Sequence, residues 1–177
     1  MKIYVLRHGQ TKLNLEKKFN GKFDEDINEE GIRQAEKAAE TVKNLDIDLV
    51  ICSPLKRTMH TCEIANVNKI QVILDERLEE RDIGIYTGKP LGEFYEKEYW
   101  NYNSTKEVEG LESIRDLFNR VKDFLDEIKE KYKGKNILLV THGGVSRGIY
   151  FYFNEIPEDG MLQKYGTENC QIKEYEL

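Results

Sequence analysis

The chain has 177 residues, of which 39 % are hydrophobic and 34 % charged, and its formal net charge is −6. These proportions are typical of a soluble globular protein, and the negative charge argues against broad binding to nucleic acid or anionic membranes. No apolar run approaches the roughly 18 residues of a membrane-spanning helix, and the N-terminal "MKIYVL" is too short for a signal peptide. We therefore expect a single domain over residues 1–177, located in the cytoplasm, as a monomer or homodimer.

Apolar runs and amphipathic stretches alternate along the chain. Strands are expected at 2–6, 47–52, 71–74, 136–141 and 170–177, helices at 29–44, 53–64, 112–132 and 145–154, and a short helix within 92–102. Asn28 can cap the first helix, and Ser53 and Pro54 suit the N-cap and first residue of the second. Continuous apolar strands separated by helices predict a three-layer α/β/α sandwich. Its central sheet is expected to be mostly parallel, with an antiparallel edge strand at the C-terminus.

Two of the expected strands end in a histidine that is followed by glycine. The first strand runs into "LRHG", with Arg7 and His8, and the strand at 136–141 runs into "THGG", with His142. Arg57 follows the strand at 47–52, just inside a helix N-terminus. In parallel sheets of this kind, ligands bind beyond the carboxyl ends of the strands, so these four side chains are expected at one ligand site.

This set of side chains suits a phosphate dianion. Arginine presents a planar fork of donors to phosphate, and nearby arginines lower the pKa of a histidine, which leaves a neutral nucleophile near pH 7. Attack on phosphorus would give a phosphohistidine, and the departing alkoxide would need a proton from a carboxylic acid. Four acids in one irregular stretch are candidates for that proton donor, and the residues alone do not choose among them: Glu76, Glu79, Glu80 and Asp82.

Six segments resemble, in the same order, motifs of the histidine phosphatase superfamily, which includes the cofactor-dependent phosphoglycerate mutase-like proteins. The similarity extends over nearly the whole chain, and Leu111 departs from it where the family carries a second glycine. The segments are "LRHGQTKLN", "FNGKFDEDINEEGIRQA", "SPLKRTMHT", "LEERDIGIYTG", "GLESIRDLFNRV" and "VTHGGVSR".

The resemblance implies a phosphoglycerate mutase-like fold and a role for each motif residue. His8 would be the nucleophile, and Glu80 would be the general acid and base. Arg7, Arg57 and His142 would hold the phosphoryl group. Five further positions line the phosphate site in members of the family: Thr11, Asn14, Asn20, Gly21 and Gly143.

Two other features match no catalytic position. His60 is expected at the surface or partly buried. The aromatic-rich stretch 94–103 can be read in two ways, as a wall of the substrate pocket or as a packed helix whose Tyr and Trp tips meet water.

The favoured function is hydrolysis of a small phosphorylated metabolite without metal or cofactor. Phosphoglycerate mutase activity is the alternative, but residues 89–111 contain no arginine, and Ile83 replaces the aromatic residue that the mutases carry three positions after the acid. A non-catalytic phospho-ligand binding protein is disfavoured because both histidines, both arginines and the acid are present. A metal-dependent hydrolase is disfavoured because arginines flank the candidate histidine ligands.

Overall fold

The computed structural model of the protein describes residues 1–92 and 94–177. A five-stranded sheet in the order β3-β2-β4-β1-β5 forms its centre. The strands are β1 Lys2–Arg7, β2 Leu49–Cys52, β3 Val72–Leu74, β4 Ile137–Thr141 and β5 Ile172–Glu176. β1 to β4 pair in parallel, and β5 pairs antiparallel with β1 at the sheet edge. The expected sheet and its antiparallel edge strand are therefore confirmed.

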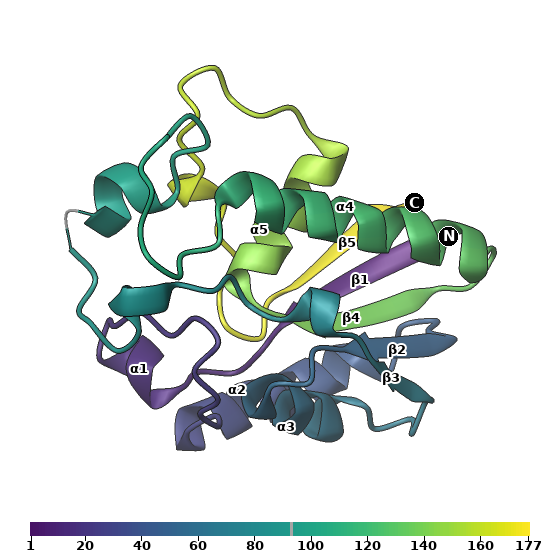
Figure 1. The fold of residues 1–177 in the computed structure, drawn as a ribbon. Coiled ribbons are helices and arrows are strands. Elements are labelled where there is room, and N and C mark those ends of the chain that lie inside the picture. Colours follow the sequence, from purple (N-terminus) through teal and green to yellow (C-terminus); the bar gives the residue numbers. More distant parts are fainter. Residues whose placement is uncertain (93) are drawn as a thin grey trace.

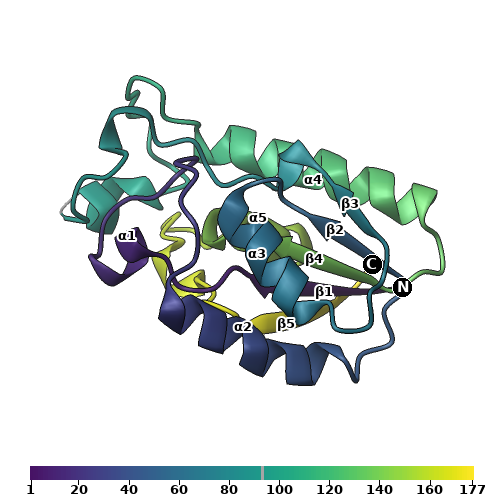
Figure 2. The same cartoon turned by 90° about the horizontal axis from the view of Figure 1, so that it is seen from below.

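Helices cover both faces of this sheet. α4 and α5 lie on one face, and α2 and α3 lie on the other (Figures 1 and 2). The helices are α1 Lys12–Leu15, α2 Glu29–Val42, α3 Lys56–Ala65, α4 Ile114–Lys131 and α5 Gly143–Phe153. Short 3₁₀ turns at Glu76–Leu78, Gly84–Tyr86 and Gln163–Tyr165 and a π-helix at Tyr95–Tyr99 complete the described elements.

The alternation of side chains along each strand produces two separate cores. In β1, Ile3 and Val5 pack toward α4 and α5, whereas Tyr4 and Leu6 pack toward α2 and α3. Because successive strand residues point to opposite faces, a strand covered by helices on both sides has to be apolar at every position. Each fully buried aliphatic or aromatic side chain of this kind contributes about 1.5–3 kcal/mol.

The expected start of the helix at 53–64 is wrong. α3 begins at Lys56, and its N-cap residue Leu55 makes no side-chain capping bond. The Ser53 N–H still donates to the Val140 carbonyl at 3.0 Å, so the backbone at this point continues the sheet and cannot yet open a helix. The Ser53 hydroxyl lies instead against His142.

The other elements differ from expectation only in their ends. α5 begins at Gly143, two residues earlier than expected, and Asn28 accepts from the Gly31 N–H as the predicted cap of α2. The short helix expected within 92–102 is present as the π-helix, while Glu93 lies outside the described residues. Among the described helices, none is both long enough and apolar enough to cross a lipid bilayer.

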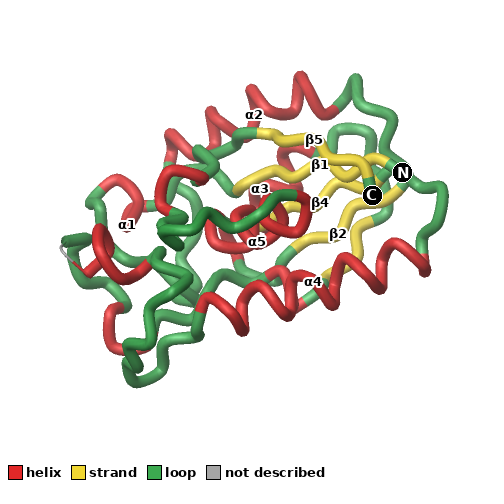
Figure 3. Tube along the Cα trace, turned by 90° about the horizontal axis from the view of Figure 1, so that it is seen from above, coloured by secondary structure: helices red, strands yellow, loops and turns green. Residues whose placement is uncertain are grey.

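The irregular segments gather at one end of the molecule. They lie beyond the carboxyl ends of the parallel strands, and the two chain termini lie at the opposite end (Figures 1 and 3). This is the edge at which the sequence predicts a ligand site.

Candidate active site

The register of the sheet brings His8 and His142 together. Arg7, the last residue of β1, is paired with Thr141, the last residue of β4, so the next residue of each strand is a histidine. The His8 N–H donates to the Thr141 carbonyl at 3.0 Å, and the two imidazole centroids are 5.2 Å apart. Both side chains are buried, with 3 % and 0 % of their surface exposed.

The hydrogen bond of His8 fixes its tautomer. Nδ1 lies 2.7 Å from the Gly9 carbonyl oxygen, which can only accept, so Nδ1 carries the proton. In the neutral ring Nε2 then has a free lone pair. Nε2 has no hydrogen-bond partner among the described residues, so His8 presents an unprotonated nitrogen that is free to act as a nucleophile.

His142 has the opposite tautomer. The Arg57 Nε–H donates to His142 Nδ1 at 3.2 Å, so Nδ1 is the acceptor. The proton of the neutral ring is then on Nε2, which lies 2.8 Å from the Ser53 hydroxyl and donates to it. Three strand ends, those of β1, β4 and β2, therefore contribute to one hydrogen-bonded cluster.

Arg57 is fully buried and is held by the loop that precedes α2. Its terminal nitrogens donate to the Gly21 carbonyl at 2.7 Å and the Phe23 carbonyl at 2.8 Å. Arg7 donates through a terminal nitrogen to the Thr167 carbonyl, and its Nε is buried without a partner among the described residues. Two guanidinium groups thus meet at the histidine pair with unused N–H bonds, which is the donor pattern expected for a phosphate site.

The burial of the cluster keeps both imidazoles neutral. Desolvation, followed by the positive charges of Arg57 and Arg7, holds the pKa of His8 well below 6.5. Desolvation and Arg57 lower the pKa of His142 in the same direction. Burial also lowers the pKa of Arg57 to about 10, so the guanidinium remains charged at neutral pH.

Glu80 lies at the N-terminus of α5. The Gly144 N–H donates to both of its carboxylate oxygens, at 3.0 and 3.1 Å, and the Arg81 N–H donates to one of them at 2.8 Å. Of the four acids that the sequence left open, Glu80 alone lines the described cavity that adjoins the histidine pair.

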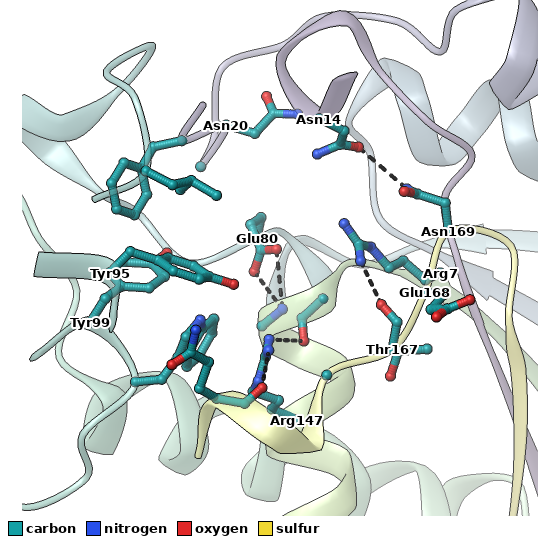
Figure 4. Close-up of a pocket in the computed structure, with 18 of the residues that line it drawn as sticks. Arg7, Asn14, Asn20, Glu80, Tyr95, Tyr99, Arg147, Thr167, Glu168 and Asn169 are labelled. Atoms are coloured by element: carbon teal, nitrogen blue, oxygen red, sulfur yellow. Dashed lines mark hydrogen bonds between the residues drawn. The ribbon is translucent and has the colours of Figure 1, made fainter. Parts of the chain in front are cut away.

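That cavity has a volume of about 610 Å³, which suits a small metabolite. Arg7, Glu80, Asn14 and Asn20 surround it (Figure 4). Of the positions implied by the resemblance, Arg7, Asn14, Asn20, Gly21, Glu80 and Gly143 line the cavity, whereas His8, Arg57 and His142 form the buried cluster beside it.

Thr11 is the one implied position that neither lines the cavity nor belongs to the histidine cluster. It is fully buried, and its hydroxyl accepts from the Asn14 N–H at 3.2 Å and from the Asn20 side-chain amide at 3.0 Å. Thr11 therefore orients two lining residues and does not itself reach the cavity.

A model of the histidine phosphatase superfamily, branch 1, matches residues 3–177. The chain belongs to this superfamily. Its relative Phosphoserine phosphatase 1 of Hydrogenobacter thermophilus is 32 % identical over 184 residues, which cover 100 % of this chain and 85 % of the relative. Phosphoglycerate mutase-like protein 4 of Arabidopsis thaliana is 37 % identical over 158 residues, covering 84 % and 69 %.

A solved structure supports the same assignment at the level of the fold. YhfR of Bacillus stearothermophilus superposes with a TM-score of 0.89 at 23 % identity, over 99 % of this chain and 91 % of the other. The family and the phosphoglycerate mutase-like fold are confirmed, and so is the expected class of enzyme, a histidine-type phosphatase or mutase-like phosphotransferase.

Sequence patterns do not identify several residues that lie at the cavity or in the histidine cluster of this histidine phosphatase. Ser53 has the residue type and position of a helix cap, and the segment 163–169 matches none of the six motifs. In the structure, Thr167 accepts from Arg7, and the Asn169 side chain donates to the His8 carbonyl at 2.9 Å and the Asn14 side chain at 3.3 Å (Figure 4). Contacts this distant along the chain leave no local pattern.

The aromatic stretch forms part of the cavity wall and is packed, but the Tyr99 and Trp100 side chains are buried and do not meet water as the second interpretation expected. Tyr95, Tyr99 and Trp100 line the cavity, and the last two also belong to the core cluster that includes the buried residues of α4 and α5. His60 lies outside the site and contacts Asp26 at 2.9 Å. Within residues 1–92 and 94–177, no group of three or more His, Cys, Asp and Glu side chains is placed to hold a metal ion.

Proposed function

We propose that this histidine phosphatase is a phosphomonoesterase that hydrolyses a small phosphorylated metabolite through a phosphohistidine on His8. The observation that carries the proposal is the free Nε2 lone pair of His8, since Nδ1 is committed to the Gly9 carbonyl at 2.7 Å. Burial and two guanidinium groups keep this ring neutral by lowering its pKa, so it can attack phosphorus at neutral pH.

In the first step, His8 Nε2 forms a bond to phosphorus while the ester P–O bond breaks. Arg7, Arg57 and His142 surround the negative charge that spreads over the phosphoryl oxygens. Glu80 gives a proton to the departing alkoxide. The resulting carboxylate then accepts a proton from the water that attacks the phosphohistidine, which releases phosphate and restores His8.

The segment between the acid and α4 supports hydrolysis over mutase activity. The segment between the acid and α4 contributes Leu91, Tyr95, Tyr99 and Trp100 to the described wall and no arginine. A mutase has to retain its monophosphorylated product and return the phosphoryl group to a second hydroxyl of it. The relative named Phosphoserine phosphatase 1 also favours the phosphatase assignment.

The proposal is tested by assaying a panel of phosphate monoesters for phosphate release, with interconversion of 2- and 3-phosphoglycerate measured alongside. We expect phosphate release that persists in EDTA. Interconversion without release would support the mutase alternative. Binding of inorganic phosphate without turnover of any ester would support a binding protein, and loss of activity in EDTA with rescue by a divalent metal would contradict the metal-free mechanism.

A further inference from the structure

A hydrogen-bond donor in the cavity has no acceptor. The indole Nε1 of Trp100 is buried and lacks a partner among the described residues, although Trp100 lines the cavity. Indole nitrogen can only donate, and a buried donor without an acceptor is rare in native proteins. Because Trp100 forms part of the cavity wall, a bound ligand can supply the missing acceptor.

A second donor group lies directly beside this indole. The Arg147 guanidinium stacks over the Trp100 ring at 4.0 Å, lines the same cavity and is only 6 % exposed. It donates to the carbonyls of Leu162 at 3.3 Å, Gly143 at 3.3 Å and Gln163 at 3.0 Å.

These three bonds are all to neutral carbonyls. A guanidinium has five N–H bonds, so two remain after the three that are used. No carboxylate forms an ion pair with Arg147 among the described residues. A buried cation is normally paired, so Arg147 too lacks a partner that a ligand can supply.

The two groups lie on the side where the leaving alcohol has to be. A Cβ atom built on Gly144 would be 2.2 Å from Glu80 Oε1 and 3.3 Å from Trp100 Cη2, so the indole edge lies next to the proposed proton donor. In Figure 4, the two tyrosines lie on one side of Glu80 and Arg7 and Asn169 on the other, and Arg147 lies below Glu80. An ester whose phosphoryl group meets Arg7 would extend its alcohol past Glu80 toward Trp100 and Arg147.

We propose that Trp100 and Arg147 form a subsite for a carboxylate on the leaving alcohol, so that the preferred substrates are phosphate esters of hydroxy acids or hydroxy-amino acids. The inference rests on the proposed function. One indole N–H and the remaining N–H bonds of one guanidinium match the two oxygens of a monoanionic carboxylate. Their single positive charge balances a monoanionic carboxylate, whereas a second phosphate dianion would keep one negative charge without a partner.

The first test compares two esters that differ only by a carboxylate, O-phosphoserine and O-phosphoethanolamine. We expect a preference in kcat/KM of about tenfold or more for phosphoserine, the range of a hydrogen bond to a charged group. In Trp100→Phe, which keeps an aromatic ring under Arg147 but removes the N–H, this preference falls and the KM for phosphoserine rises. Tyr102→Phe is the matched aromatic control, since Tyr102 lies outside this cavity, and it keeps the preference.

A second test needs no variant. Trp100 is the only tryptophan of the chain, so the intrinsic tryptophan fluorescence reports directly on the proposed subsite. We expect 2-amino-4-phosphonobutanoate to shift the Trp100 emission and to bind about tenfold or more tightly than 3-aminopropylphosphonate, which lacks the carboxylate. Neither compound can be cleaved by the proposed reaction, because the phosphorus is bonded to carbon.

The outcomes separate the subsite from the proposed function. Equal turnover of the two esters, equal binding of the two phosphonates, or an unchanged preference in Trp100→Phe overturns the carboxylate subsite and leaves the phosphatase intact. Tight binding of the carboxylated phosphonate by a protein that hydrolyses no ester supports the subsite and contradicts the proposed function.

Discussion

The Gly144 N–H donates to both carboxylate oxygens of Glu80, at 3.0 and 3.1 Å. This contact fixes the proposed proton donor to the first turn of α5, directly after His142 at the end of β4. The position of the acid relative to the phosphoryl site is therefore set by the same strand end that carries the second histidine.

Gly144→Ala should displace the Glu80 carboxylate. The new Cβ would lie 2.2 Å from Oε1, so the carboxylate has to retreat by about an ångström to reach an ordinary contact. Because a misplacement of that size can reduce catalysis about 100-fold, we expect a loss of that order in kcat for alkyl phosphates. Gly92→Ala is the matched control, since its Cβ would meet nothing within 4 Å. Equal activity in the two variants would contradict the role of this contact.

Ser53→Ala should loosen His142. The Nε2–H of His142 would lose its acceptor in a fully buried site, which lowers the free energy of unfolding by about 1–3 kcal/mol. The KM for p-nitrophenyl phosphate should rise as well, because His142 is no longer held in orientation. Ser146→Ala provides the comparison, since the buried Ser146 hydroxyl has no partner among the described residues and its removal should leave stability unchanged or higher. Urea unfolding measures the change in stability of Ser53→Ala and Ser146→Ala, and steady-state kinetics measures the change in their KM.

Glu80→Gln should slow hydrolysis most for those esters whose leaving group most needs a proton. Glutamine occupies nearly the same volume but cannot transfer a proton, so alkyl phosphates should lose far more kcat/KM than aryl phosphates with good leaving groups. A series of esters with alcohols of increasing acidity measures this dependence. Equal loss across the series would indicate that Glu80 positions the substrate and is not the acid.

Stability should fall as the solution becomes mildly acidic. Burial, Arg57 and Arg7 lower the native pKa of His8 and His142 well below 6.5, so between those values and 6.5 the unfolded chain binds more protons than the native state. The free energy of unfolding then decreases with falling pH, by up to about 1.4 kcal/mol per pH unit for each histidine, and the full stability is present above pH 6.5.

Urea unfolding between pH 7.5 and 5 measures this slope. His8→Gln removes one of the two titrating groups and should make the slope shallower. A free energy of unfolding that stays constant, or that rises, as pH falls from 7 to 5 would contradict the burial of two neutral imidazoles.

The sequence predicted the parts of the fold that depend on local patterns. Continuous apolar runs indicated strands covered on both faces, and the histidine–glycine pairs after two of them indicated the ligand edge. The register that makes Arg7 and Thr141 neighbours follows from this, because parallel strands bring their carboxyl ends to one edge.

Tertiary contacts decided what the sequence could not predict. Ser53 has the residue type of a helix cap, but its backbone continues the sheet and its hydroxyl serves His142. Asn169 and Thr167 reach Asn14 and Arg7 from more than 150 positions away along the chain. Arg147 is the last residue of the motif "VTHGGVSR", and its stacking on Trp100 depends on two segments that no local pattern connects.

The central claim is that His8 carries the phosphoryl group, and trapping the phosphoenzyme tests it most directly. The enzyme is mixed with a substrate identified in the ester panel, quenched in alkali, digested with trypsin and analysed by mass spectrometry. Cleavage after Arg7 and Lys12 releases residues 8–12, whose one histidine is His8. We predict one phosphoryl group on this peptide that is stable in alkali, is lost in acid and is absent from His8→Ala. Phosphorylation of another peptide, or labelling that persists in His8→Ala, would contradict the mechanism.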